Sequence, residues 1–424
     1  MPKPDLNFDQ LSRDVQIICA DLETLVSTFG PSRCVARMAN DRDPRIGKNY
    51  EFPMFAAIST IVERMSKDFG LGLWLFQDCG NIILLSTLKS ERNPTIENIK
   101  EIPVTLTSHA DEITFLIKKD SKVLFPLCNT RPFSEYGFMH HEGKILGFRG
   151  EGDERVFREV GTAELHQKEK KPVDKKKSQE KKFEYFLQNI KGDEQREGDL
   201  VVPNYNLTQK NYGLKTIFHS KALDDRVGVL SDIYTVKELA RAGIPSKAIL
   251  VGDEEGVDSE LAWARLARPS FARYCRPDGI TILCDGFDGK KLYEFSEFDG
   301  KHLEAGLIAP YRSEGKGAGD PGLFSLLRDE VIPLAKKHGF EAVTTTDYVS
   351  RSLDPKIMDD FPFICSIDWS NGPVMTPTFV KDNPALSYFN VCHVDESVAI
   401  SQVLNIIGTT FWSACFLHKK MVQP

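Results

Sequence analysis

The sequence has few of the features that mark disulfide-rich or secreted proteins. Its nine cysteines are dispersed, with no C-x-x-C pair, at positions 19, 34, 79, 128, 275, 284, 365, 392 and 415. Such a set predicts reduced thiols in a reducing compartment. The first residues, MPKPDLNFDQLSRD, carry too many charges for a signal peptide. We therefore expect a cytoplasmic protein.

An excess of positive charge and a nucleotide-binding loop are also lacking. The net charge is −7, which gives no overall signal for nucleic acid. The glycine-rich EGKGAGDPG, residues 314–322, lacks the G-K-[ST] ending of a phosphate loop. We expect neither nucleic acid nor a nucleotide as a partner.

One run, from Ala399 to Leu417, is apolar enough to need a test against membrane insertion. No second span lies near it. The run contains six polar residues: Ser401, Gln402, Asn405, Thr409, Thr410 and Ser413. A buried C-terminal helix fits this composition better than a membrane span, so no membrane is expected.

The remaining composition is that of a soluble globular protein, with 41% hydrophobic and 27% charged residues. A length of 424 residues leaves room for two or three domains. Residues 8–68 have helical patterns, broken at PSR and at DRDPRIGKN, and strand-like LGLWLF, NIILLST and PVTLT follow. From residue 213 onward, helical and strand patterns alternate. This order predicts an α/β fold with a mixed, mostly parallel sheet flanked by helices.

In that second part we expect specific helices and strands. The expected helices are 226–242, 259–269, 322–338 and 396–417, and the expected strands are AILVG, GITILC and YFNVC.

A stretch of different character interrupts the α/β pattern. Between residues 113 and 212, short β-like runs are separated by Gly, Asp and Asn, without a long helical period. This pattern is typical of a small β-domain or barrel. We therefore divide the chain into a first catalytic part at 1–112, an inserted barrel-like domain at 113–212 and a second catalytic part at 213–424.

The expected β-domain carries a lysine-rich insert, QKEKKPVDKKKSQEKK, at residues 167–182. It holds eight lysines and three acidic residues, a local charge of +5. A solvated, disordered loop is the expectation, with docking of an acidic partner or RNA as the alternative. Its lack of interleaved aromatic residues gives no support to nucleic-acid binding.

Metal-ligand residues follow the strand-like runs. His109, Glu254–Glu255, Asp285 and His393 each come after an apolar run, and Asp224 lies at the start of an expected helix. Ligands of open α/β sheets bind beyond the carboxyl ends of the strands. Histidines and carboxylates gathered there suit a pair of divalent metal ions. The pattern predicts a metal-dependent hydrolase.

Each position also has a plainer interpretation. Asp224 and Asp225 could cap the following helix, and Asp111 could cap a turn instead of orienting His109 through its second ring nitrogen. The acidic run that ends in Glu254–Glu255 could be a solvated turn. However, adjacent carboxylates repel one another unless cations neutralise them. Neighbouring glutamates also point in different directions, so one can hold a metal while the other transfers protons.

Together these blocks resemble the tetrahedral (TET), or deblocking, co-catalytic dimetal aminopeptidases. The resemblance rests on six segments in the family's order: DCGNIILL, SHADEITF, KALDDRVGV, GDEEGV, ILCDGFDG and VCHVDE. KALDDRVGV is the most specific of them. An expected β-domain between His109 and Asp224 also favours this family over related deacylases and carboxypeptidases, in which the extra domain comes later in the chain.

The resemblance implies roles for the site residues. His109 and Asp285 would hold one metal ion, Glu255 and His393 the other, and Asp224 would bridge them. Glu254 would be the general base and acid, and Asp111 would orient His109. The function implied is an aminopeptidase that removes N-terminal residues from peptides with two divalent ions, zinc or cobalt, and a metal-activated water. The alternatives are a deacylase of the same chemistry and a non-catalytic adaptor that keeps the fold.

The sequence departs from the family in three places. The family's Gly-Thr-Asp-Ala segment is replaced by Ser366-Ile367-Asp368-Trp369, residues 286–360 are longer than usual, and the N-terminal 70 residues match poorly. The lysine-rich insert falls in the domain that the family uses for assembly. We expect a homo-oligomer, a dimer at least, with the family's dodecamer as the larger possibility.

Overall fold

The computed structural model describes most of the chain. The described residues are 4–38, 45, 47–87, 94–118, 123–127, 141–169, 183–204, 207–212, 215–255, 268–276, 278–288, 306–309, 325–344, 364–371 and 396–422. The 314–322 loop, the YFNVC run, His393 and most of the lysine-rich insert lie outside these residues. The first three residues of the insert, 167–169, belong to a strand.

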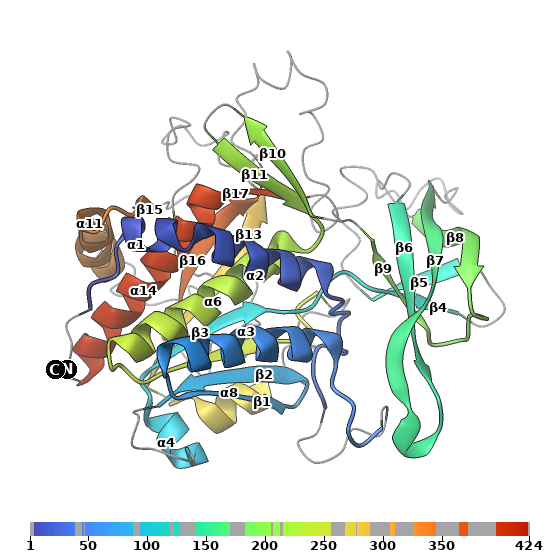
Figure 1. The fold of residues 1–424 in the computed structure, drawn as a ribbon, viewed down its shortest axis with the longest axis horizontal. Helices are drawn as coiled ribbons and strands as arrows, with labels where there is room; N and C mark the ends of the chain where they lie inside the picture. The colour runs from blue at the N-terminus through green and yellow to red at the C-terminus, as the bar shows by residue number, and fades with distance from the viewer. Residues whose placement is uncertain are drawn as a thin grey trace, which may run out of the picture.

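The centre of the molecule is an eight-stranded mixed sheet (Figure 1). Its strands, in spatial order, are β1 (Leu73–Asp78), β2 (Asn81–Ser86), β12 (Ser246–Val251), β3 (Val104–His109), β13 (Ile280–Asp288), β16 (Ile364–Asn371), β14 (Gly306–Ala309) and β15 (Ala342–Thr344). Neighbours from β12 to β16 run parallel, as do β14 and β15. The pairs β1–β2, β2–β12 and β14–β16 are antiparallel. The parallel centre gives the sheet a shared carboxyl edge.

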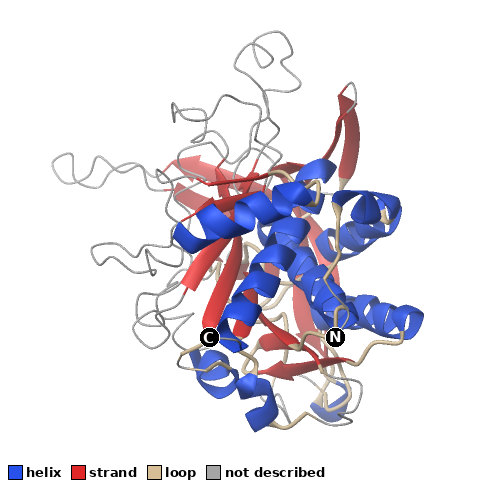
Figure 2. Ribbon diagram, turned by 90° about the vertical axis from the view of Figure 1, so that its left-hand side faces the viewer, coloured by secondary structure: helices blue, strands red, loops and turns tan. Residues whose placement is uncertain are grey.

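Helices cover both faces of this sheet. One face carries α1 (Phe8–Arg13), α2 (Val15–Ser27), α3 (Pro53–Phe69), α6 (Leu223–Arg241), α11 (Ile332–Lys337, after the π-helical η3, Leu327–Val331) and α14 (Ile400–Val422). The other carries α4 (Ile96–Glu101) and α8 (Arg268–Tyr274). Figure 2 shows the helices layered against the strands. The expected α/β architecture is thus confirmed at the level of a mixed sheet flanked by helices.

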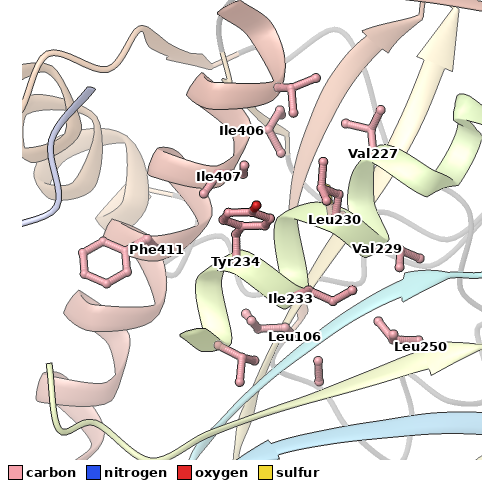
Figure 3. Close-up of a cluster of buried hydrophobic side chains, with 14 of the residues drawn as sticks. Leu106, Val227, Val229, Leu230, Ile233, Tyr234, Leu250, Ile406, Ile407 and Phe411 are labelled. Atoms are coloured by element: carbon pink, nitrogen blue, oxygen red, sulfur yellow. The ribbon is translucent and has the colours of Figure 1, made fainter. Parts of the chain in front are cut away.

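The larger core lies where α6 and α14 pack on the central strands. Figure 3 shows Leu230 and Tyr234 of α6 between Ile407 of α14 and the strand residues Leu106 and Leu250. All five side chains are buried, and full burial of a large apolar side chain stabilises a protein by about 1.5–3 kcal/mol. The layer fixes α6 against β3 and β12, and Asp224 is the second residue of α6.

The expected C-terminal helix is present and buried. Of the described helices, α14 is the one long and apolar enough to cross a membrane, yet 83% of its most apolar window is buried in the fold. Its start was predicted wrongly. Glu396–Ala399 forms strand β17, which pairs with β11 (Lys215–Ser220) in a three-stranded sheet with β10 (Thr208–Tyr212). Backbone pairing with a distant strand outweighed the local helical pattern.

A closed six-stranded barrel stands beside the sheet, at the right of Figure 1. Its strands are β4 (Phe115–Ile117), β5 (Val123–Pro126), β6 (His141–Arg149), β7 (Val156–Glu169), β8 (Phe183–Gly192) and β9 (Leu200–Pro203), with the short 3₁₀ helix η1 (Gly152–Glu154) between β6 and β7. The strand β10 pairs with β11 rather than with the barrel. The domain boundaries after residues 112 and 212 remain a prediction.

The segment between α2 and α3 packs against the barrel. Phe52 of this segment and Phe157 of β7 are both buried, with ring centroids 6.0 Å apart. They share an apolar cluster with Cys34 and the barrel residues Leu146 and Val202. The barrel is therefore tied to the α/β part through the segment that follows Ser32, at Cys34 and Phe52.

Cysteines follow the expected pattern where they are described. The six described cysteines are Cys19, Cys34, Cys79, Cys275, Cys284 and Cys415. No disulfide joins any of these six residues.

Candidate dimetal centre

Three predicted site residues come from the adjacent carboxyl ends of β3 and β12. The last residue of β3, His109, is in register with Val251, the last residue of β12. Glu254 and Glu255 follow a short turn after β12. One nitrogen of His109 and one carboxylate oxygen from each glutamate lie within 4.8 Å of one another. The strand-exit pattern in the sequence thus corresponds to a real cluster.

Asp224 joins this cluster from the start of α6. Its Oδ1 lies 3.3 Å from Nε2 of His109, and the residue is 4% exposed. Glu254 approaches the same ring nitrogen, with its Oε2 at 3.8 Å. Two carboxylates therefore converge on one imidazole nitrogen.

The two aspartates at the start of α6 have separate tasks. Oδ1 of Asp225 accepts a hydrogen bond from the backbone N–H of Gly228 at 2.8 Å, as a helix cap does. A Cβ at Gly228 would lie 2.2 Å from the Asp225 carboxylate, so any other residue there would displace this carboxylate. The peptide bond between Asp224 and Asp225 is cis. The capping interpretation is therefore correct for Asp225, while Asp224 faces His109.

Asp111 organises the cluster from two residues beyond β3. Its Oδ1 accepts the backbone N–H of Glu254, and its Oδ2 accepts that of Glu255, both at 3.0 Å. Oδ1 also lies 3.4 Å from Nδ1 of His109. The sequence predicted only the contact with His109. The bonds to the glutamate turn make Asp111 a positioning residue for three members of the site.

The remaining predicted ligands are only partly described. Asp285 lies on β13, two residues beyond Leu283, which is in register with Thr107 of β3. Its backbone is therefore level with His109 on the neighbouring strand. The same residue is in register with Asp368 of β16. His393 lies outside the described residues, so its place in the site remains a prediction.

The pKa directions show a cluster that favours a cation. Burial lowers the pKa of His109, but the Glu254 charge and the contacts with Asp111 and Asp224 outweigh it and raise that pKa well above its usual value. Burial and the charges of Glu255, Asp111 and Asp224 raise the pKa of Glu254 to about 8. Despite its burial, Asp111 has a lowered pKa because His109, Ser32 and the Glu254 N–H stabilise its charge. Crowded carboxylates around an imidazole create a strong demand for positive charge.

The donor set fits divalent metal ions. Imidazole nitrogen and carboxylate oxygen are ordinary ligands of zinc and of related transition metals. The two glutamates differ in accessibility, since the Glu254 side chain is 18% exposed while Glu255 is buried. The cluster therefore offers one buried carboxylate and one that solvent reaches.

A buried ion-pair network lies behind the site. Lys221 donates to Oε2 of Glu112, and Arg226 lies 3.9 Å from Oε1 of the same carboxylate. All three side chains are at least 97% buried. This network ties the residue after Asp111 to the segment that carries Asp224.

The sequence prediction missed the segment at residues 30–33. The hydroxyl of Ser32 donates to Oδ2 of Asp111 at 2.7 Å, and its backbone N–H donates to Thr114. Arg33, next in the chain, pairs with Asp253 at 2.8 Å. The sequence pattern predicts only a break between helices at PSR. Its Gly-Pro-Ser-Arg composition gives no periodic signal, and its partners are about eighty residues or more away in the sequence.

Comparisons with known proteins support the fold. No protein-family model and no curated protein matches the sequence. Solved structures do match. A TET aminopeptidase from the marine sediment archaeon Thaumarchaeota archaeon SCGC AB-539-E09 has a TM-score of 0.62 at 13% identity, with 94% of this chain and 96% of that chain covered.

Two further structures agree with it. The aminopeptidase APDkam598 from Desulfurococcus kamchatkensis has a TM-score of 0.58 at 14% identity, over 96% of this chain and 97% of that one. The TET1 peptidase of Pyrococcus horikoshii, described as assembling into a tetrahedron or a large octahedral shell, has a TM-score of 0.57 at 14% identity, over 94% and 99%. The resemblance inferred from the sequence is confirmed at the level of the fold: this chain has the fold of the TET aminopeptidases.

Proposed function

We propose that this protein is a dimetal-dependent aminopeptidase that removes N-terminal residues from peptides. The observation that carries the proposal is the convergence of His109, Asp224, Glu254 and Glu255 around Asp111 at one edge of the sheet. The aminopeptidase fold adds support. The proposed ligands are His109, Asp224, Glu255, Asp285 and His393.

Two divalent ions, zinc or cobalt, would supply the positive charge that polarises the scissile carbonyl and makes water a better nucleophile. The residues of this chain supply the proton transfers. Glu254 has a pKa near 8 before metal is bound, and added positive charge lowers it toward neutrality. A carboxylate of this kind can take a proton from water and return it to the leaving amine.

Asp111 would hold Glu254 and Glu255 in positions that suit their different roles, base and metal ligand. Its two oxygens each hold one backbone N–H of the glutamate turn, so the two side chains leave the turn from a fixed backbone. Small displacements of the proton-transferring group lower the rate of hydrolysis, because proton transfer requires hydrogen-bond distance.

We also propose a cytoplasmic homo-oligomer, with the barrel used for assembly or for substrate access. The Pyrococcus horikoshii TET1 structure is of a protein that assembles into shells, and this chain keeps a closed barrel beside its sheet. The separation of catalytic and barrel domains at residues 112 and 212 belongs to the same proposal.

The test is metal stoichiometry by elemental analysis together with a substrate panel. The full chain, loaded with zinc or cobalt, should hold about two ions and cleave peptides and aminoacyl amides that have a free amine. N-acetylated versions of the same substrates should be poor. Preference for the N-acetylated versions would favour a deacylase, and bound metal without turnover on either set would favour the adaptor.

A further inference from the structure

Arg33 lies at the carboxyl edge of the sheet, beside the candidate site. The segment before it pairs with the exit of β3, since Glu112 N–H donates to the Gly30 carbonyl at 2.9 Å. The Arg33 N–H donates to the carbonyl of Gly252 at 2.8 Å. Gly252 lies two residues before Glu254, so the Arg33 backbone is fixed within a few residues of the glutamate turn on the β12 side.

The backbone of Arg33 is unusual for a residue with a side chain. Its φ angle is +67°, in the left-handed region where glycine carries no penalty and most other residues do. A non-glycine residue there costs on the order of 1 kcal/mol. An arginine at a position that favours glycine indicates that the side chain has a use.

The guanidinium is anchored at one point and open elsewhere. Its Nε donates to Oδ2 of Asp253 at 2.8 Å, while the side chain of Arg33 stays 50% exposed and that of Asp253 only 2%. The described residues offer no hydrogen-bond partner to its two terminal amino groups. A guanidinium has five N–H donors, so the edge of the fork remains available for a second carboxylate.

Two of the other basic side chains near the site cannot play this part. Lys221 and Arg226 are 3% and 0% exposed and face Glu112 behind the cluster. Arg33 is instead held by the residue directly before Glu254, with half of its side chain in solvent. It offers an accessible cation at the rim of a site whose described rim is otherwise rich in carboxylates.

We propose that Arg33 is an anion subsite that binds a carboxylate of the peptide substrate. This inference rests on the proposed peptidase function and names its substrate class. The carboxylate has two possible sources: the side chain of an acidic N-terminal residue, or the terminal carboxylate of a short peptide. Arginine suits either because its fork binds carboxylates through two parallel hydrogen bonds.

The experiment compares two pairs of peptides on the zinc-loaded full chain. Glu-Ala-amide against Gln-Ala-amide tests the side-chain source, and Leu-Ala against Leu-Ala-amide tests the terminal source. We expect a higher kcat/KM for the charged member of one pair. Arg33→Gln should reduce that charged-to-neutral ratio by about ten- to a hundred-fold, the usual effect of losing a hydrogen bond to a charged group. The pair whose ratio falls identifies the source.

Two variants separate substrate binding from the neutralisation of Asp253. Arg33→Lys keeps the charge but loses the fork, so it should retain only part of the ratio. The double variant Arg33→Gln/Asp253→Asn removes both partners and leaves no uncompensated carboxylate. Its charged-to-neutral ratio of kcat/KM should fall as far as that of Arg33→Gln. If the double variant restores the ratio, Arg33 acts only by neutralising Asp253 and the subsite is overturned.

A matched control is Arg276→Gln, because Arg276 also pairs with an aspartate, Asp278, but precedes β13 at the opposite edge of the sheet. It should keep the ratio. Equal kcat/KM values within both pairs for the wild type would overturn the subsite and leave the peptidase proposal intact. If the wild type cleaves none of the peptides, the peptidase proposal fails. Calorimetry then measures the affinity of the same four peptides. The subsite stands if the wild type binds the charged member of one pair more tightly and Arg33→Gln removes that preference.

Discussion

The carboxylate of Asp111 accepts the backbone N–H of Glu254 at 3.0 Å, across 143 positions of sequence. Its other oxygen holds the N–H of Glu255 at the same distance. Asp111 therefore acts on the glutamate turn as well as on His109. The turn is fixed by the exit of β3, so the geometry of the proposed base and of one proposed ligand depends on the neighbouring strand.

Asp111→Asn should disturb the glutamate turn. An asparagine amide has one acceptor oxygen and an NH₂ group that cannot accept, so one of the two backbone N–H groups would lose its partner. We expect a fall of about 10–100-fold in metal affinity, with a loss of stability of about 1–3 kcal/mol. Competition with a chromophoric chelator measures the affinity, and chemical denaturation measures the stability.

Ser32→Ala is the graded companion of that variant, because it removes one of the donors to Asp111 and leaves both backbone N–H bonds in place. Its effect should have the same direction and be smaller. Asp278→Asn, at an exposed ion pair on the far edge of the sheet, should change neither quantity noticeably. An Asp111→Asn protein with wild-type metal affinity would show that the glutamate turn keeps its conformation without both bonds to residue 111.

Glu254→Gln should remove turnover and keep the metals. General acid–base catalysis contributes about 10²–10⁴-fold to rate, and an amide cannot carry the proton. Elemental analysis and kcat for a free-amine peptide are the two measurements, with Glu97→Gln on the exposed helix α4 as control. Loss of metal would instead make Glu254 a ligand, a result that its 3.8 Å approach to His109 would explain.

The sequence predicted the strand exits well because two local signals coincide there. Apolar, β-branched runs end at His109 and shortly before Glu254, and polar residues follow each of them at once. The parallel pairing of β3 and β12 then brings the exits together. The role of Asp111 toward the turn was not predictable, since it depends on backbone N–H groups that any residue would present. Ser32 and Arg33 were missed for a related reason: their partners are distant in sequence and their own segment has no period.

Metal affinity should rise with pH. Contacts with the carboxylates of Glu254, Asp111 and Asp224 outweigh burial and raise the pKa of His109 well above its usual value, so the metal-free protein keeps a proton on this imidazole to a higher pH than an ordinary histidine does. An ion that uses His109 must displace this proton. Below that raised pKa, affinity should increase about tenfold per pH unit for each proton released.

Chelator competition at pH 6, 7 and 8 measures this slope, and calorimetry in buffers of different ionisation enthalpy counts the protons. His418→Asn is the control, because His418 is half-buried in α14 and its burial lowers its pKa. It should leave the slope unchanged. An affinity that stays constant over this range would exclude His109 as a protonated ligand site.

Asp232→Asn should stabilise the metal-free protein, and the gain should grow as the pH rises. Asp232 is fully buried on α6, and Oδ2 accepts the hydroxyl of Ser108 at 2.8 Å. Burial raises its pKa well above the usual value. A carboxyl with a raised folded pKa contributes stability below its unfolded pKa, about 3.9, and that contribution is lost as pH rises through the folded pKa. Asparagine keeps an acceptor for Ser108 without this dependence.

We expect Asp232→Asn to raise the free energy of unfolding by about 1–3 kcal/mol above pH 7, and by less as the pH falls toward 4. Denaturation of both proteins with chelator present, from pH 4 to pH 8, gives the comparison, and a difference that does not grow with pH would mean that Asp232 is ionised in the folded protein.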